Sequence, residues 1–325
     1  MRIAIQMERP GPPEVLVPVE LPDHAPPPDE VVVRSAVSGV NRADLFIRSG
    51  EWEVQSGKFP YVPGLEVAGV VEQVGANVTS VKPGDRVITM MQRLGGVHGV
   101  RPGGYQSHVC VHAGVLAAIP DGLDTETAGT LGLPAVTAEQ ALRVLSVHPG
   151  DRVLVQGGSS AVGTMAIQMV RALGGIAIGT GQSPAKFELM RRCGAKQVVD
   201  TRGQGWSKQL DPVHGVIDLV GAATFQESVS LLRPGGRLVF VGGTTGGKVT
   251  FSAWDLMGPV TLTGYSTETL TRDALAEAMQ HISLLAAQGR LAAHQVLRVP
   301  LKEAARAHRE MESGAVAGRV VLTAG

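Results

Sequence analysis

This sequence of 325 residues has few cysteines, no net charge and no long apolar run. Its two cysteines, Cys110 and Cys193, exclude both a disulfide-rich scaffold and a four-cysteine zinc site within one chain. The 29 basic and 29 acidic residues cancel, which argues against nucleic-acid binding, because such proteins carry a basic excess. No apolar run approaches the roughly 18 residues of a transmembrane helix, and the opening MRIAIQMERP lacks the apolar core of a secretory signal. These absences predict a cytoplasmic enzyme that acts on a small molecule, with neither a nucleic-acid nor a membrane partner.

Glycine, by contrast, is abundant, and its 42 copies are dispersed among short Val-rich runs, as expected for tight turns between strands. The first third of the chain is β-rich, with the runs separated by turn sequences such as KPGD at residues 82–85. The expected strands in this part span residues 31–37, 68–74 and 86–89. Strands at this spacing predict a small barrel or sandwich.

The pattern changes near residue 120, after which short apolar strands alternate with helices. The expected strands are 152–156, 176–179, 197–199, 216–220, 237–241 and 259–265, and the expected helices are 162–173, 184–192 and 224–232. Such alternation predicts a parallel sheet that is covered by helices on both faces. Mixed elements follow: a helix over 271–287, a strand over 295–299, a helix over 301–312 and a strand over 319–322.

The strongest local motif is VLVQGGSSAVG at residues 153–163, which lies after a strand and before a helix. It is similar to the G-x-G-x-x-G turn of dinucleotide-binding folds, with Gly158 and Gly163 in the first and third positions and Ser160 in the second. Gly158 would make the tight turn, and Gly163 would let the helix pack against the sheet. The free amides at the helix start favour a bound phosphate, although an ordinary strand-to-helix turn is the alternative. The expected cofactor contacts here are Gly158, Ser159, Ser160, Ala161, Val162 and Gly163.

The choice of cofactor depends on the end of the second strand, where NAD-preferring folds place an acidic residue. Here no acid follows that strand until Glu188. Ser183 and Lys186 offer a hydroxyl and a cation instead, which suit a ribose 2′-phosphate and therefore predict NADPH. Thr180 is expected to contact the cofactor beside them. A solvated Lys186 on the following helix is the alternative.

Several longer motifs follow one another along the chain. They are NRAD with IRSG in residues 41–50, PGLEVAGVV at 63–71, PGDRV at 83–87, GGY at 103–105, LPAVTA at 133–138 and the turn at 157–163. Together they resemble the medium-chain dehydrogenase/reductase superfamily, and more closely its zinc-free quinone oxidoreductase (zeta-crystallin-like) branch. The resemblance covers essentially the whole chain. It implies an α/β fold with a Rossmann doubly wound parallel sheet (122–266, NADP-binding) inserted in a discontinuous GroES-like β-rich catalytic domain (1–121 and 267–325).

The zinc positions of the superfamily carry other residues here. Asn41 stands where zinc members have their first cysteine, and Leu65 stands where they have the histidine of G-H-E. Residues 89–104, the region of the structural zinc lobe, contain no cysteine. Catalytic zinc needs about three protein ligands, and leucine cannot be one of them. No metal is therefore expected.

The resemblance also implies roles for individual side chains. Asn41 would lie by the nicotinamide ribose and the substrate, where its amide can donate a hydrogen bond to a carbonyl or ribose oxygen. Asp44 would hold the adjoining loop or a substrate-side water; both are candidate catalytic residues, with helix capping as the alternative. Phe46 and Trp52 would bind substrate, although plain packing explains them equally well. The further cofactor contacts that the resemblance implies are Asn41, Thr137, Gly221, Val241, Gly242, Gly243 and Arg319.

Two other features have structural explanations. Glu66 lies in a run rich in Val, Ala and Gly that should be buried, and a buried carboxylate needs a partner. We expect that partner to be an arginine. Cys110 and Cys193 have no adjacent histidine and none of the surroundings of a nucleophile.

The chemistry implied is consistent with the loss of zinc, because quinones and α,β-unsaturated carbonyls accept reducing equivalents without a Lewis acid. The prediction is thus an NADPH-dependent, zinc-independent quinone or enone reductase. An enoyl-thioester reductase and a non-catalytic, crystallin-like NADPH-binding protein remain open as alternatives. The strand over 259–265 is expected to lie at the edge of the sheet and to pair with its own copy in a homodimer, because exposed edges are a liability.

Overall fold

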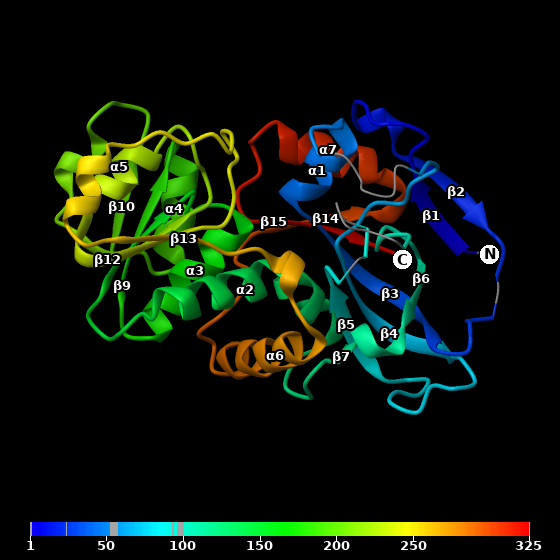
Figure 1. Ribbon diagram of the computed structural model, residues 1–325. Helices are drawn as coiled ribbons and strands as arrows, with labels where there is room; N and C mark the ends of the chain where they lie inside the picture. Colours follow the sequence, from blue (N-terminus) through cyan, green and yellow to red (C-terminus); the bar gives the residue numbers. More distant parts are fainter. Residues whose placement is uncertain (1, 24, 53–57, 93, 96–100, 325) are drawn as a thin grey trace. The chain divides into compact units, whose positions relative to one another are not determined.

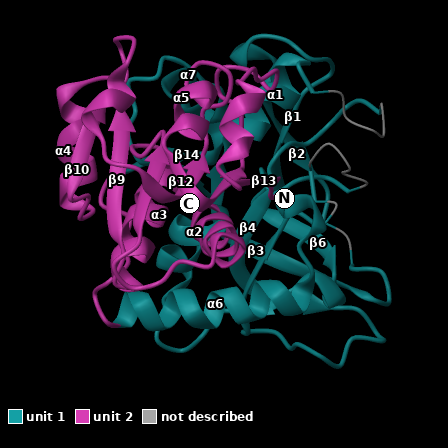
Figure 2. Ribbon diagram, turned by 60° about the vertical axis from the view of Figure 1, so that its left-hand side comes forward, with its two compact units in different colours: residues 1–133, 267–287, 296–325 teal, residues 134–266, 288–295 magenta. Residues whose placement is uncertain are grey.

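The structure is a computed structural model that describes residues 2–23, 25–52, 58–92, 94–95 and 101–324 (Figure 1). The chain forms two compact units, which Figure 2 colours separately. Unit 1 comprises residues 1–133, 267–287 and 296–325, and unit 2 comprises residues 134–266 and 288–295. The division falls inside helix α2 (Thr125–Leu145), at a kink where Gly132 leaves helical geometry. No helix in the described part of the chain is long and apolar enough to span a membrane.

Unit 2 is built on six parallel strands in the order β10-β9-β8-β11-β12-β13. Their bounds are β8 (Arg152–Gln156), β9 (Ile176–Gly181), β10 (Gln197–Asp200), β11 (Val213–Asp218), β12 (Leu232–Phe240) and β13 (Thr261–Gly264). The chain moves outward from β8 to β10, returns to place β11 beside β8, and continues to β13. This is the strand order of the Rossmann fold, and it confirms the predicted doubly wound sheet.

The central strands of unit 2 are buried because helices cover them. Residues at their centres, such as Leu154, Ile178 and Val216, are fully inaccessible, as expected for parallel strands without a solvent face. The helices are α3 (Ala161–Ala172), α4 (Pro184–Arg192) and α5 (Phe225–Ser230). The segment 288–295 also belongs to this unit, since the Gln168 side chain of α3 exchanges two hydrogen bonds of 2.9 Å with the Ala292 backbone.

Two predicted strands of unit 2 lie too far along the chain, and one of them, expected over 237–241, is β12, which starts at Leu232 and ends at Phe240. The expected strand over 216–220 is β11, which starts at Val213 and ends at Asp218. It stops there because the Asp218 carboxylate accepts the backbone N–H groups of Val220 and Gly221 at 2.9 and 2.8 Å, which turns the chain. Residues 219–220 therefore belong to the loop at the carboxyl end of the sheet.

Unit 1 is β-rich, as predicted from the first third of the chain. A seven-stranded sheet has the order β14-β15-β3-β4-β5-β7, with β6 also paired to β3, and β1 and β2 form a two-stranded sheet. The strand bounds are β1 (Arg2–Gln6), β2 (Val17–Leu21), β3 (Glu30–Val40), β4 (Glu66–Val74), β5 (Arg86–Met90), β6 (His108–His112), β7 (Ala117–Ala118), β14 (Val296–Pro300) and β15 (Arg319–Thr323). Besides the first part of α2, the helices are α1 (Arg42–Ser49), α6 (Arg272–Ala287) and α7 (Ala304–Glu312).

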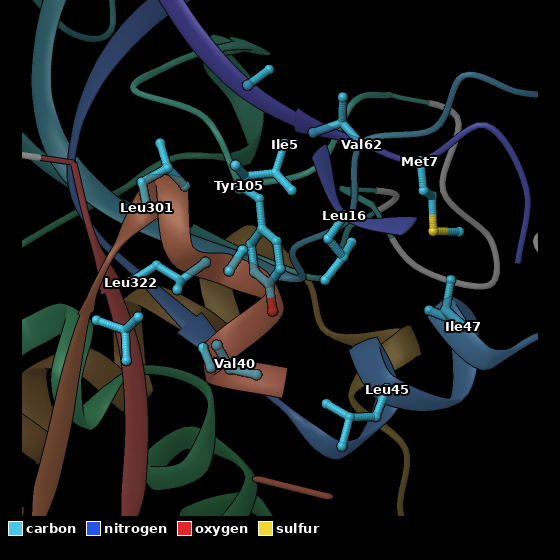
Figure 3. Close-up of a cluster of buried hydrophobic side chains, with 14 of the residues drawn as sticks. Ile5, Met7, Leu16, Val40, Leu45, Ile47, Val62, Tyr105, Leu301 and Leu322 are labelled. Atoms are coloured by element: carbon cyan, nitrogen blue, oxygen red, sulfur yellow. The ribbon is translucent and has the colours of Figure 1, made fainter. Parts of the chain in front are cut away.

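A single apolar cluster joins segments of unit 1 that are far apart in sequence (Figure 3). Ile5 of β1, Leu45 of α1, Tyr105 and Leu322 of β15 are all buried in it. The Tyr105 hydroxyl lies 3.0 Å from Nε2 of His308, which is itself buried on α7. Burial lowers the pKa of His308 to about 3, so this ring is neutral and belongs to the core.

Candidate functional site

The glycine turn of unit 2 is shaped by close backbone contacts. Gly157 follows β8 with a φ of +72°, a conformation that favours glycine. A Cβ on Gly163 would collide with the Gly157 carbonyl oxygen and would lie 2.7 Å from the Gly158 Cα. A Cβ on Gly158 would lie 2.7 Å from the Met190 sulfur. The turn can therefore press the first turn of α3 against the end of β8 only because these positions are glycine.

Ser160, an expected cofactor contact, also has a structural contact within the protein. Its hydroxyl oxygen accepts the Gly163 N–H at 3.1 Å and so caps α3, which a serine before a helix commonly does. The N–H groups of Ala161 and Val162 lie in the first turn of α3, where no carbonyl of the helix is available to accept them. The turn can offer these groups, together with the Ser160 hydroxyl proton, to a phosphate.

Thr180 supports the turn from the neighbouring strand. Its hydroxyl accepts the Gly157 N–H at 3.1 Å and donates to the Gln156 side-chain oxygen at 2.6 Å, and the side chain is 2% exposed. Both hydrogen-bonding directions of this hydroxyl are used inside the protein, so any contribution to cofactor binding acts through the shape of the turn. The Gln156 side-chain amide donates in turn to the Ser228 hydroxyl. Nothing in the sequence had pointed to Gln156 or Ser228 as part of this site.

The expected 2′-phosphate residues lie where β9 ends. Ser183 is the N-cap position of α4, Lys186 is in its first turn, and both are half-buried. The neighbouring strand β10 brings a residue that sequence reasoning missed, because Asp200 pairs with Gly181 in the sheet. Arg202 binds the Asp200 carboxylate through Nε at 2.9 and 3.0 Å and thereby lowers its pKa. The sequence signal that could have identified Asp200 is an acidic residue at the end of the third strand of the sheet, β10.

Glycines also end the fourth and fifth strands at this edge. Gly221 has a φ of +85°, and a Cβ there would lie 2.5 Å from the Gly246 carbonyl oxygen. The backbone carbonyl of Asp218 accepts the N–H groups of Val241 and Gly242 at 2.9 and 3.3 Å. Gly243 packs against Gly246 in the same way as Gly221. Because all six strands are parallel, these loops lie at the same sheet edge as the glycine turn.

A buried polar cluster in unit 1 contains three of the residues singled out in the sequence. Arg319, at the start of β15, forms an ion pair with Glu66, and both side chains are 2% exposed. This confirms the arginine partner expected for Glu66. Arg319 also donates to the Asn41 side-chain oxygen at 3.0 Å, while the Asn41 amide nitrogen donates to Glu66 Oε1 at 2.8 Å. Arg319 was expected to contact the cofactor, and its hydrogen bonds within unit 1 hold this cluster together.

The same ion pair contacts the kink of α2. Glu66 Oε2 accepts the Leu133 N–H at 2.7 Å, and Arg319 Nε donates to the Thr130 carbonyl at 3.2 Å. A Cβ on Gly132 would overlap Glu66 Oε2, and Gly132 has a φ of +31°. The Glu66 carboxylate thus accepts the Leu133 N–H in place of the backbone carbonyl that would accept it in a regular helix. Thr137, which follows the kink in unit 2, is buried.

Asp44 caps helix α1. Its Oδ2 accepts the backbone N–H of Asn41 at 2.8 Å, as the capping alternative predicted for this pair, while the Asn41 side chain is turned to Glu66 and Arg319. Asp44 is fully buried, and burial raises its pKa to about 7, with the nearby Glu66 charge acting in the same direction.

This pKa gives the stability of the protein a dependence on pH that Asp44→Asn should remove. A carboxyl group whose pKa rises from 3.8 to about 7 on folding binds more protons folded than unfolded, so it destabilises the fold progressively as the pH rises through that interval. Asparagine keeps an acceptor for the Asn41 N–H without the charge. We expect the variant to match the wild type near pH 4 and to exceed its free energy of unfolding by about 4 kcal/mol near pH 8. Urea unfolding at both pH values measures this, and an equal difference at both would contradict it.

Phe46, which is half-buried, and Trp52, which is exposed, form an aromatic pair on unit 1. Their ring centroids lie 5.0 Å apart with the planes tilted by 49°, and the backbone N–H of Trp52 donates to the Phe46 carbonyl at 3.0 Å. Trp52 is 45% exposed.

The zinc positions of the superfamily hold no ligands here. The Asn41 side chain is hydrogen-bonded to Glu66 and Arg319, and Leu65 is buried among apolar residues. Within residues 2–324, gaps aside, no group of three or more His, Cys, Asp and Glu side chains is placed to hold a metal ion.

Comparison with known proteins identifies the family. Residues 27–121 match the alcohol dehydrogenase GroES-like domain, and residues 193–322 match the zinc-binding dehydrogenase family. Quinone oxidoreductase 1 of Escherichia coli is 31% identical over 338 aligned positions that span 99% of both proteins. The chain belongs to the quinone oxidoreductase branch of the medium-chain dehydrogenase/reductase superfamily. It is a quinone oxidoreductase-like enzyme, which confirms the resemblance read from its motifs.

Two further proteins are similar to this chain. The crystal structure of Escherichia coli quinone oxidoreductase complexed with NADPH matches 99% of this chain, and 99% of that one, with a TM-score of 0.89 and 30% identity. A component of the phenolphthiocerol/phthiocerol polyketide synthase of Mycobacterium tuberculosis is 28% identical over 99% of this chain, which corresponds to 15% of that much longer protein.

Proposed function

We propose that this enzyme uses NADPH to reduce quinones or α,β-unsaturated carbonyls, without a metal. The observation that carries the proposal is the carboxyl edge of the unit 2 sheet, where the glycine turn, the start of α3 and the Ser183–Lys186 segment meet. A Cβ at Gly163 would collide with the Gly157 carbonyl oxygen, so the turn presses the start of α3 against the end of β8, and the NADPH complex of a relative supports the cofactor. Residues 122–266 are the proposed NADPH-binding domain, and residues 1–121 and 267–325 the catalytic domain.

Individual residues would have distinct tasks. When bound, NADPH supplies the reducing equivalents, and the protein binds and orients the reactants. The amides of Ala161 and Val162 would bind the pyrophosphate, and Ser183 with Lys186 would bind the 2′-phosphate. Asn41 would donate a hydrogen bond from its amide. Phe46 and Trp52 would stack on a flat substrate. The remaining proposed cofactor contacts are Thr137, Gly158, Ser159, Ser160, Gly163, Thr180, Gly221, Val241, Gly242, Gly243 and Arg319. Asp44 would hold the loop beside Asn41 as the second proposed catalytic residue.

A substrate panel with NADPH tests this function. Quinones and enones should be reduced, as followed by the loss of NADPH absorbance, and turnover should survive EDTA because an activated carbonyl needs no Lewis acid. Elemental analysis should find no stoichiometric zinc. Loss of activity on chelation, restored by zinc, would overturn the metal-free proposal, and the absence of turnover with every quinone and enone would overturn the substrate proposal.

Reduction of an enoyl thioester is the second candidate. The full-length match to a segment of a polyketide synthase favours it, because such synthases carry their intermediates as thioesters. The same panel decides, since faster turnover of enoyl thioesters than of quinones would assign the chain to this class. Saturable NADPH binding without any turnover would instead favour a non-catalytic, crystallin-like role.

We further propose a homodimer formed through the strand at 259–265. In the described part of the chain, β13 pairs with β12 alone and ends the sheet. The short helix just before it exposes large apolar side chains, with Trp254 82% and Met257 75% exposed. An unpaired edge beside apolar surface is what a self-complementary contact would cover.

Charges on that surface should split the dimer. Trp254→Asp combined with Met257→Asp would place two carboxylates in a buried contact, where desolvation opposes association. We expect light scattering at micromolar concentration to give about twice the 33.9 kDa chain mass for the wild type and the mass of one chain for the variant. Leu284→Asp, at a 55% exposed leucine of α6, is the matched control and should remain dimeric. A wild type that scatters as a single chain would refute the dimer.

A further inference from the structure

We propose that Glu66 and Arg319 are positioning residues that lock the Asn41 carboxamide in one orientation, so that it always offers an N–H to an oxygen of the bound reactants. This inference rests on the proposed function for the identity of those reactants. The lock itself is a property of unit 1 alone, because Asn41, Glu66, Arg319 and the kink of α2 all belong to that unit.

The orientation of the amide follows from the chemistry of its two partners. A guanidinium can only donate hydrogen bonds, and a carboxylate can only accept them. The Asn41 oxygen faces Arg319 Nη1 at 3.0 Å, and the Asn41 nitrogen faces Glu66 Oε1 at 2.8 Å. Turning the amide over would set donor against donor and acceptor against acceptor. Only one orientation therefore satisfies both charges.

Neither partner can follow the amide if it turns. Arg319 is also bonded to the carbonyls of Val40 and Thr130, each at 3.2 Å, and Glu66 Oε2 is bonded to the Leu133 N–H. Both charged side chains are 2% exposed, so water does not compete for them. A buried ion pair is weak evidence for added stability, because desolvation offsets its attraction, whereas it fixes geometry well.

The lock leaves one amide proton for use. One Nδ2–H is directed to Glu66, and the other has a contact of 3.5 Å with the Gly39 carbonyl, at the long limit for a hydrogen bond. Asn41 is half-buried. Its second N–H can therefore move to a better acceptor, which would be either a substrate carbonyl or a ribose hydroxyl.

Glu66→Gln tests the lock, because glutamine keeps the size of the side chain but can also donate. In NMR spectra of the protein without cofactor, we expect the Asn41 side-chain amide protons and the Leu133 N–H to exchange with water at least about tenfold faster in the variant, the factor that corresponds to loss of a charge-assisted bond. Glu312→Gln is the matched control. It removes the carboxylate that pairs with buried Arg48 in the same unit, and it should leave both signals unchanged. If Glu66→Gln does not fold, Arg319→Lys tests the same bonds.

A double-mutant cycle then connects the lock to function. Glu66→Gln should lower kcat/KM about tenfold in the wild-type chain and less than about twofold in the Asn41→Ala chain, because residues that act through one group are not additive. If the NADPH dissociation constant changes by the same factor, the acceptor is a ribose hydroxyl; if it does not change, the acceptor is the substrate carbonyl.

The outcomes separate this inference from the proposed function. Unchanged hydrogen exchange at Asn41 and Leu133 in Glu66→Gln would overturn the lock. The lock would also be overturned if Glu66→Gln lowered kcat/KM by the same factor in the Asn41→Ala chain as in the wild-type chain. If no quinone, enone or enoyl thioester is turned over, the proposed function fails, and the exchange measurement still decides whether the amide is locked.

Discussion

A single methyl group at position 163 should abolish tight NADPH binding. The Cβ of Gly163→Ala would collide with the Gly157 carbonyl oxygen and lie 2.7 Å from the Gly158 Cα, closer than real Cβ contacts. Both neighbours are backbone atoms and cannot rotate away, so the turn must open and the α3 amides must move. We expect the NADPH dissociation constant, measured by calorimetry, to rise by about 100-fold, which corresponds to about 2.7 kcal/mol.

Gly203→Ala is the matched control for this change. Gly203 lies in the same unit, its added Cβ would meet nothing within 4 Å, and its backbone is not in the left-handed region. It should bind NADPH like the wild type. Undiminished binding by Gly163→Ala would mean that the turn is not the cofactor site.

The second large effect concerns the choice between NADPH and NADH. The wild type should prefer NADPH, and replacing both Ser183 and Lys186 by alanine should weaken NADPH binding by about 100-fold while sparing NADH, because only NADPH has the phosphate that these groups would bind. Lys208→Ala removes a lysine from a short helix elsewhere in unit 2 and should change neither affinity. Equal affinities of the wild type for the two cofactors would refute the prediction.

The fold was largely predictable because its signals are local. Strand β8 and helix α4 have the bounds expected from apolar runs and from the Ser-Pro start of the helix. The end of β11 was not predictable, because it depends on the Asp218 side chain bonding two amides further along the chain. The kink in α2 depends on Glu66, which is 67 residues away from Leu133 in sequence.

The candidate site was predictable in its residue types and less so in their contacts. A glycine turn, a capped helix and a buried glutamate with an arginine partner all follow from local composition and burial. Ser160 and Arg319 were each predicted to contact the cofactor, and this prediction stands, but their contacts within the protein were not foreseen: Ser160 caps α3, and Arg319 joins Asn41 to Glu66. Such contacts depend on which segments the fold brings together, and β15 joins β3 across almost 300 residues of chain.

The place of β15 in the sheet has a consequence for the order of folding during synthesis. Strand β15 lies between β14 and β3, and Arg319 at its start completes the polar cluster with Glu66. Because β15 follows the other strands of its sheet in the sequence, the sheet of unit 1 remains open until β15 has been synthesised, whereas residues 134–266 already contain all six strands of unit 2. Domains generally fold as units while the chain is being synthesised. We therefore expect the six-stranded sheet of unit 2 to form first on the ribosome, and the polar cluster of unit 1 to form only after β15 has been synthesised.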